Sequence, residues 1–170
     1  MKIPFSPPFI DQDVISEVVD TLQSGWITTG PKVKALENEV AKLTGVSNTL
    51  CVNSWTSGAI LILKWFGIKE GDEVIIPAYT YSATALAVLH CGATPIMVDV
   101  KDDFTADPEK IKQAITSKTK IIMPVDIAGL PCDFDPINEM VNDAEIKALF
   151  NPSSENQKKL GRILVLSDAA

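Results

Sequence analysis

The sequence predicts an α/β fold in which helices pack on a mostly parallel sheet. Short apolar runs alternate with stretches of helical periodicity along most of the chain. Most of these runs are nearly continuous, as is typical of strands buried on both faces. Because strand and helix follow each other in turn, the helices are expected to connect parallel strands and to cover the sheet.

The first part of the chain is predicted to be helical. Residues 11–25, "DQDVISEVVDTLQSG", carry apolar residues at helical spacing and end at a glycine. Residues 26–33, "WITTGPKV", are typical of a loop. Residues 31–45, "PKVKALENEVAKLTG", show a second amphipathic pattern, with proline near the start and glycine after the end.

Strands and helices alternate after this point. Strands are predicted at residues 49–53, 72–77, 94–100, 120–126 and 162–168. Helices are predicted at residues 56–67, 81–92, 107–115 and 133–143. The segment "FNPSSENQKKLGR", residues 150–162, is polar and rich in Ser, Asn and Lys, so we expect an exposed loop there.

Composition excludes several classes of protein. The net charge is −7 and no long basic cluster occurs, which argues against nucleic acid or an anionic membrane as a partner. Three cysteines without a CxxC pair argue against a disulfide framework or a zinc site and favour a reducing compartment. The start, "MKIPFSPPFIDQD", has prolines where a signal peptide needs an apolar core. We therefore expect a cytoplasmic protein.

Candidate site residues follow the predicted strands, because ligands of open α/β sheets bind at the carboxyl ends of the strands. The segment "NSWTSG" opens a helix whose N–H groups suit a phosphate, with hydroxyls at Ser54, Thr56 and Ser57 and close approach at Gly58. Taken alone, a plain helix cap explains this segment more simply. The common nucleotide-binding glycine motifs are absent from it.

Two further strand ends carry candidate residues. Tyr79 and Tyr81 are placed to cover a flat ring, although packing at the rim of the sheet also explains them. Asp168 ends a buried strand, where a carboxylate is costly unless it is paired, although an N-cap also explains it. Together the three strand ends suit a phosphate, a flat ring and a protonated nitrogen, and pyridoxal phosphate (PLP) has all three.

These motifs resemble those of a known family. The chain is similar to the sugar aminotransferases of the DegT/DnrJ/EryC1/StrS type, which are fold-type-I PLP enzymes. The resemblance covers nearly the whole chain in order and spacing. Its carriers are "GWITTGPKVKALE", "VNSWTSGAILIL", "GDEVIIPAYTYSATALAVLHCGATPIMVDV", "ITSKTKIIMPVDIAG" and "ILVLSDAA".

The resemblance implies roles for individual residues. Trp55, Thr56 and Ser57 match the turn that holds the cofactor phosphate, and Tyr81 matches the aromatic residue that stacks on the pyridine ring. Asp168 matches the catalytic carboxylate that pairs with the pyridine nitrogen. The sequence departs from the family at Trp55, where a small residue is usual.

The resemblance also implies a reaction. Glutamate is expected to give its amino group to the cofactor, which then aminates a keto group of a nucleotide-linked sugar. Such amino sugars enter cell-surface polysaccharides or natural products. Trp26 and Thr28 match a stretch near the substrate pocket, and Asp126 stands where the family often has His. The family further implies a homodimer, and neither a metal nor a membrane is expected to take part.

The extent of the chain matters for activity. Residues 1–170 match the N-terminal arm and the first part of the PLP-binding large domain, without the rest of that domain or the small C-terminal domain. The family's Schiff-base lysine lies beyond the segment that matches "DAA", so we expect these residues alone to be inactive. Two alternatives stay open: a truncated, inactive binding or regulatory paralogue, and a PLP-dependent sugar dehydratase with His in place of that lysine.

Overall fold

The computed structural model describes residues 7–169. The first six residues of the proline-containing start, and Ala170 of the "SDAA" motif, lie outside this range. The chain forms two compact units, Met1–Cys51 and Val52–Ala170, which we call the N-terminal unit and the sheet unit.

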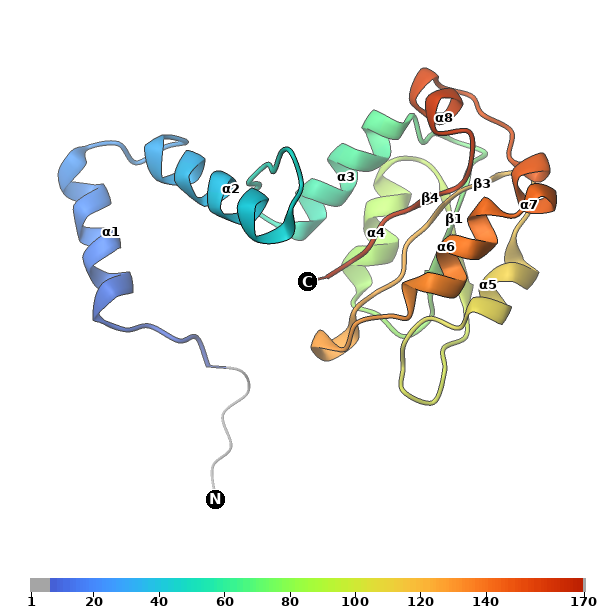
Figure 1. The fold of residues 1–170 in the computed structure, drawn as a ribbon, viewed down its shortest axis with the longest axis horizontal. Coiled ribbons are helices and arrows are strands. Elements are labelled where there is room, and N and C mark those ends of the chain that lie inside the picture. Colours follow the sequence, from blue (N-terminus) through green and yellow to red (C-terminus); the bar gives the residue numbers. More distant parts are fainter. Residues whose placement is uncertain (1–6, 170) are drawn as a thin grey trace. The chain divides into compact units, whose positions relative to one another are not determined.

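The N-terminal unit contains the two helices that the sequence predicts, α1 (Gln12–Ser24) and α2 (Pro31–Thr44) (Figure 1). Asp11 caps α1 by accepting a hydrogen bond from the N–H of Val14 at 2.9 Å. A left-handed glycine, Gly25, ends α1 with φ 71°. The predicted loop and both helices are therefore confirmed.

The apolar side chains of α1 and α2 are exposed rather than packed. Neither helix contains a buried residue. The exposed residues include Val14, Ile15, Val18, Val19, Leu22, Leu36, Val40 and Leu43. Short helices are marginal in water without a packed face, so packing within these two helices contributes little to the stability of the unit.

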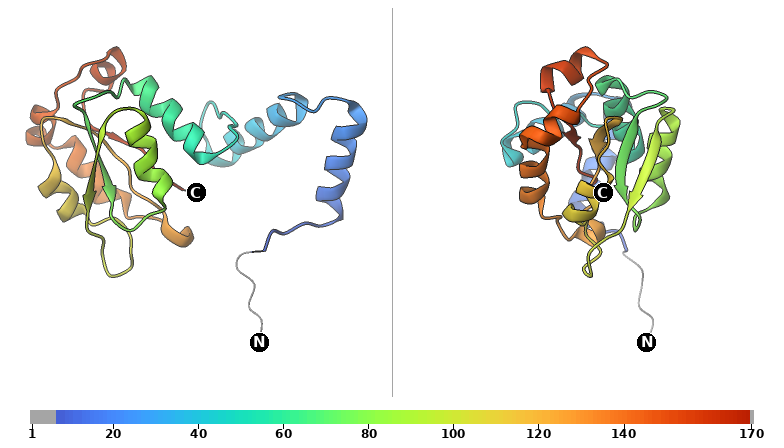
Figure 2. Two further views of the ribbon diagram at one scale, coloured as in Figure 1. Left: turned by 180° about the vertical axis from the view of Figure 1, so that it is seen from behind. Right: turned by 90° about the vertical axis from the view of Figure 1, so that its right-hand side faces the viewer.

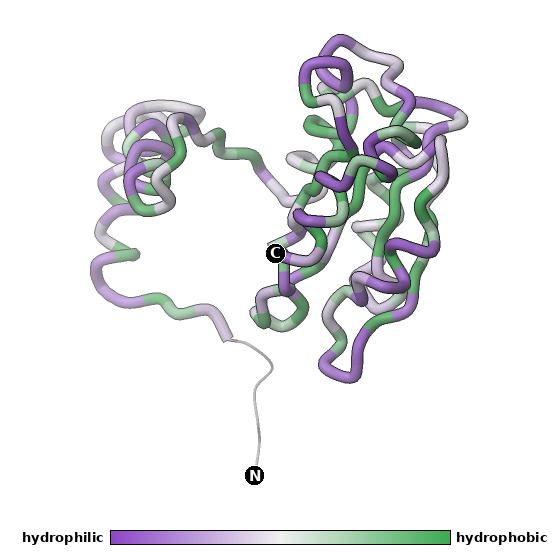
Figure 3. Tube along the Cα trace, turned by 45° about the vertical axis from the view of Figure 1, so that its right-hand side comes forward, coloured by the Kyte–Doolittle hydropathy of each residue, from purple (hydrophilic) through white to green (hydrophobic). Residues whose placement is uncertain are grey.

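The sheet unit is built on four parallel strands, which confirms the predicted α/β fold (Figure 1). The strands are β1 (Glu73–Pro77), β2 (Thr94–Val98), β3 (Thr119–Ile122) and β4 (Leu164–Val165). Their order in the sheet is β2-β1-β3-β4. Figure 3 shows hydrophobic stretches of the chain gathered in the interior of this unit and hydrophilic stretches at its outer turns.

Helices cover both faces of this sheet. The helices are α3 (Trp55–Phe66), α4 (Ser82–His90), α5 (Pro108–Ala114) and α6 (Phe134–Asn142). Helix α4 packs on β1 and β2 with α3 beside it, while α5 and α6 lie against the other face (Figure 2). Leu63, Ile75 and Ile137, from three different layers, are fully buried, so the core runs through the whole unit.

One predicted strand is wrong. Residues 49–53 have no regular structure, and Leu50 is 68% exposed. A strand needs a neighbour for its backbone hydrogen bonds, and none of the four described strands pairs with this segment. Instead, the N–H of Cys51 donates to the Glu37 carboxylate at 3.0 Å, and the Thr49 hydroxyl donates to the Glu37 carbonyl.

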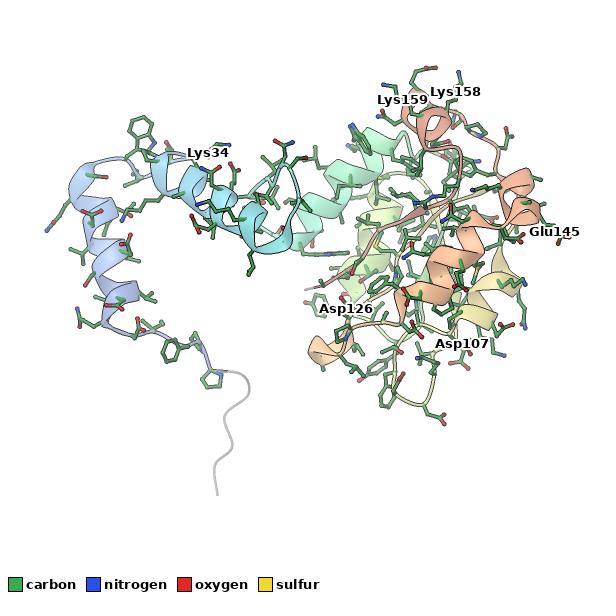
Figure 4. The ribbon with its side chains drawn as sticks, in the orientation of Figure 1. Lys34, Asp107, Asp126, Glu145, Lys158 and Lys159 are labelled. Carbon is green, nitrogen blue, oxygen red and sulfur yellow. The ribbon has the colours of Figure 1, made fainter. Side chains whose placement is uncertain are left out.

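The predicted loop at residues 150–162 is also wrong in part. It contains α8 (Glu155–Leu160), which follows another unpredicted helix, α7 (Ala144–Leu149). Gln157 of α8 is fully buried and donates from Nε2 to the Phe66 carbonyl at 3.0 Å. The polar residues of this segment thus satisfy the end of α3, while Lys158 and Lys159 point outward (Figure 4).

The contact between the end of α3 and α8 leads to a stability prediction. Gly67 has φ +82°, and a Cβ atom built on it would lie 2.5 Å from the Ser154 Cβ. Gly71 has φ +89° and open space around it. We expect Gly71→Ala to lower the free energy of unfolding by about 1–2 kcal/mol through backbone strain. Gly67→Ala should lower the free energy of unfolding by about 1–3 kcal/mol more, because the new methyl group would clash with Ser154.

Urea unfolding of both variants measures this difference. Since both glycines are left-handed, the Gly71 variant controls for backbone strain alone. Equal losses of unfolding free energy in the two variants would show that the Cβ added at position 67 does not clash with Ser154.

Candidate functional site

The candidate site lies where the order of the parallel strands reverses. From β1 the chain crosses to β2 at one edge, then returns to β3 on the opposite side of β1. The connections after β1 and after β3 therefore leave the sheet in opposite directions and open a crevice, the usual ligand position in such sheets. A pocket of about 240 Å³ lies there. It is lined by Trp55, Thr56, Thr80, Tyr81, Ala83, Thr84, Val125, Ile127 and Asp168.

The first turn of α3 forms one wall of this pocket. Ser54 caps the helix: its Oγ accepts from the N–H of Ser57 at 3.1 Å and its hydroxyl donates to the Ser57 Oγ at 3.0 Å. The N–H groups of Trp55 and Thr56, at the first two helix positions, have no acceptor within the helix. Ser54 therefore satisfies the N–H of Ser57. The N–H groups of Trp55 and Thr56, together with the positive end of the helix dipole, suit an anion.

Tyr81 also lines the pocket, at the N-cap of α4. Its side chain is 79% exposed, so its ring is accessible from solvent. Tyr79 behaves differently, because its ring packs against Phe104 with centroids 4.9 Å apart. The structure thus separates two tyrosines that the sequence treats alike: Tyr79 packs at the rim and Tyr81 lines the pocket.

Asp168 is held at the base of the pocket by its backbone and its side chain. Its N–H donates to the Pro124 carbonyl at 2.8 Å, and its carbonyl accepts from the N–H of Asp126 at 2.8 Å. These bonds form a parallel bridge between Val125 and Asp168. Asp168 is 5% exposed, and its carboxylate accepts from the Thr84 hydroxyl at 2.9 Å, as a buried charge requires.

Asp126 organises the chain that leaves β3. Its Oδ1 accepts from the N–H of Cys132 at 2.9 Å, and its Oδ2 accepts from the Ser167 hydroxyl at 3.3 Å. Figure 4 shows Asp126 beside the last segment of the chain. Cys132 is buried, and burial raises the pKa of its thiol, which donates to the Val125 carbonyl at 3.1 Å. Asp126 therefore links Ser167, next to Asp168, to the segment around Cys132 that leads to α6.

Trp26 and Thr28 line a second pocket, of about 350 Å³, within the N-terminal unit. The indole N–H of Trp26 donates to the Thr29 carbonyl at 3.0 Å. Gly30 makes room for this ring, since a Cβ there would lie 2.2 Å from the Trp26 Nε1. Lys32, in the same pocket, pairs with Asp20 at 2.8 Å and with Glu17, and these hydrogen bonds raise its pKa.

Four of the seven predicted site residues thus meet in one pocket: Trp55, Thr56, Tyr81 and Asp168. Ser57 lies in the same helical turn, where its N–H donates to the Ser54 cap, and the other two residues are in the N-terminal unit.

Two threonines that were not predicted as site residues, Thr80 and Thr84, also line the pocket. Their four-residue spacing just after a strand, at the start of an otherwise apolar helix, is the signal that marks them. Within residues 7–169, no group of three or more His, Cys, Asp or Glu side chains is arranged to hold a metal ion. None of the described helices has the length and apolar character that crossing a membrane requires.

Comparison with known proteins identifies the class. The sequence pattern of the DegT/DnrJ/EryC1/StrS aminotransferase family matches residues 8–152. The chain belongs to this family. The expected fold-type-I arrangement of helices on a parallel sheet is therefore confirmed.

Individual relatives and solved structures support the same family. The chain is 43% identical over 136 residues to the spore coat polysaccharide biosynthesis protein SpsC of Bacillus subtilis, covering 79% of this chain and 35% of that protein. A structure of the "Putative sugar aminotransferase Spr1654" of Streptococcus pneumoniae, in its PMP form, superposes with a TM-score of 0.94 at 48% identity. The match covers 100% of this chain and 43% of that one. The structure of the PLP form of the same protein superposes with a TM-score of 0.95.

The hydrogen bond of Asp126 to Cys132 predicts a labelling result. Asp126→Ala removes the acceptor of the Cys132 N–H, while Asp126→Asn keeps an oxygen at that position. Loss of this hydrogen bond should destabilise the segment around Cys132 by about 1 kcal/mol. The fraction of molecules in which this segment is locally unfolded would then rise roughly fivefold. We therefore expect a thiol reagent to label Cys132 several-fold faster in the Ala variant, with the exposed Cys51 as internal reference. Identical Cys132 rates in the two variants would contradict the role of Asp126.

Proposed function

We propose that the sheet unit binds pyridoxal 5'-phosphate and forms part of a sugar aminotransferase. The observation that carries this proposal is the single pocket that brings together the α3 helix end, Tyr81 and Asp168 from three distant segments. These groups have the chemistry that the three parts of the cofactor require. The forms of Spr1654 described as PLP and PMP forms support the same cofactor.

Each wall of the pocket has a role in this proposal. The first turn of α3, with Trp55, Thr56 and Ser57, would hold the phosphate through N–H groups, hydroxyls and the helix dipole. Tyr81 would cover the pyridine ring. The Asp168 carboxylate would hold a proton on the pyridine nitrogen. With that nitrogen charged, the cofactor supplies an electron sink for amino-group transfer.

The reaction we propose moves an amino group from glutamate to a keto group of a nucleotide-linked sugar. The family and the name of SpsC, a polysaccharide biosynthesis protein, support an amino-sugar product. We assign Trp26 and Thr28 to substrate binding, since both line a pocket in the N-terminal unit that Lys32 also lines. Trp55 stands in the cofactor pocket, so its bulk is proposed to narrow the space left for the substrate.

We also propose that the working protein is a cytoplasmic homodimer. Three cysteines without a disulfide are compatible with a reducing compartment. The exposed apolar faces of α1 and α2 are surfaces that a second copy would cover.

The proposal predicts where the cofactor does not become attached. No lysine lines the pocket among the residues that the structure describes. Borohydride treatment of the 170-residue chain with PLP should therefore give no preferred lysine in peptide mass spectra. Pyridoxal without the phosphate controls for random surface labelling. Stoichiometric, phosphate-dependent attachment to one lysine, such as Lys64, would refute the assignment of the Schiff-base lysine to a position outside this chain.

The role of Asp168 predicts a loss of cofactor affinity. Asp168→Asn removes the negative charge that the pyridine nitrogen would meet. A hydrogen bond to a charged group is worth about 1.5–3 kcal/mol, so the dissociation constant should rise roughly ten- to hundredfold. Tryptophan fluorescence during titration with pyridoxamine phosphate measures it, because Trp55 lines the pocket. The matched control is Asp102→Asn, an exposed carboxylate in a loop.

The full reaction is tested with the protein at the length that its gene encodes. Transfer of ¹⁵N from labelled glutamate to a keto sugar nucleotide would support the aminotransferase. Cofactor binding with dehydration of the sugar would favour the dehydratase instead, and absence of cofactor binding would overturn the proposal.

A further inference from the structure

A chain of two hydroxyl groups, from the half-buried Thr80 to the buried Thr84, leads to the Asp168 carboxylate. Thr84 is fully buried in α4, and its hydroxyl donates to the Asp168 Oδ2 at 2.9 Å. The Oγ1 atoms of Thr80 and Thr84 are 2.8 Å apart. Asp168 itself is 5% exposed. The three side chains therefore form a series inside the protein.

The direction of these hydrogen bonds follows from counting protons. An ionised carboxylate can only accept, and a threonine hydroxyl has a single proton. Because the proton of Thr84 is directed to Asp168, the Thr84 oxygen must accept from Thr80. Hydrogen bonds in such a series polarise each other, so Thr80 strengthens the donor that Asp168 receives.

Thr84 differs from other hydroxyl residues in the helices of this protein. Ser16, Thr21 and Thr44 each donate to the backbone carbonyl four residues earlier. This local bond is the common one for Ser and Thr within helices. Thr84 instead donates across 84 positions of sequence to a carboxylate. Its hydroxyl is therefore used for a tertiary contact rather than for its own helix.

The same helical turn also carries the pocket aromatic. The N–H of Thr84 donates to the Tyr81 carbonyl at 3.1 Å, so the backbone that presents Tyr81 is tied to Thr84. The hydroxyl of Thr84 then ties this turn to Asp168. A shift of α4 would therefore move the ring and the carboxylate together.

We propose that Thr84, supported by Thr80, is a positioning residue that orients the Asp168 carboxylate toward the cofactor and keeps it in register with Tyr81. This inference rests on the proposed cofactor site. The ligand is the aromatic nitrogen of a pyridine ring, and Thr84 acts on it only through Asp168.

The test compares Thr84→Val, which keeps the shape and removes the hydroxyl, with Thr84→Ser, which keeps the hydroxyl. Both are made in the protein at the length that its gene encodes. The dissociation constant of pyridoxamine phosphate is measured by tryptophan fluorescence, and stability is measured by urea unfolding. We expect Thr84→Val to weaken binding roughly tenfold relative to Thr84→Ser. Thr80→Val should weaken it by a smaller factor, about threefold, because it acts one bond further away.

A second buried threonine provides the control. Thr105 is 1% exposed and donates to the Asp103 carboxylate at 2.7 Å, away from the pocket. Thr105→Val should therefore reduce stability without changing the dissociation constant.

The outcomes separate this inference from the proposed function. If wild type binds the probe and Thr84→Val binds as tightly as Thr84→Ser, Thr84 is only structural and the inference is wrong. If wild type does not bind the probe, the proposed function fails first, and the inference with it. Tight binding by wild type and Thr84→Ser with weak binding by Thr84→Val supports both.

Discussion

The bridge between Val125 and Asp168 is the interaction on which the candidate site depends. It continues the pairing of β3 with β4 beyond the regular strands, through bonds from Asp168 to Pro124 and from Asp126 to Asp168. These two bonds fix the backbone of Asp168 at the carboxyl edge of the sheet. The regular strand β4 ends at Val165, so these bonds extend the pairing of the chain as far as Asp168.

The remaining walls follow from the parallel topology. In a parallel sheet every strand ends at the same edge, so the turns after β1 and β3 meet although the sequence separates them. Helix α3 packs beside α4 on one face and brings its first turn to that edge. Thr84 then links helix α4 to the β3–β4 pair. It belongs to α4, and its hydroxyl donates to Asp168, whose backbone is bonded to the chain after β3.

The two units contrast in how they are stabilised. The sheet unit has a continuous buried core from α3 through the strands to α6. The N-terminal unit has two helices that each end at a left-handed glycine, but neither contains a buried residue. Local signals are therefore sufficient to define α1 and α2, while their apolar faces are proposed to be covered in the assembled protein. The chain spans 43% of the Spr1654 chain that it matches.

The sequence by itself determined the α/β class, α1 to α6, the four paired strands and the candidate residues Thr56, Tyr81 and Asp168, because periodicity, glycines and strand ends are local features. Trp55 became a candidate through the resemblance to the family. Only the tertiary structure decided three other points. Residues 49–53 are not a strand, since pairing needs a neighbour, and α8 forms because Gln157 finds the Phe66 carbonyl. Thr84 reaches Asp168 because packing of α4 on the sheet brings together positions 84 residues apart, a distance that no local pattern encodes.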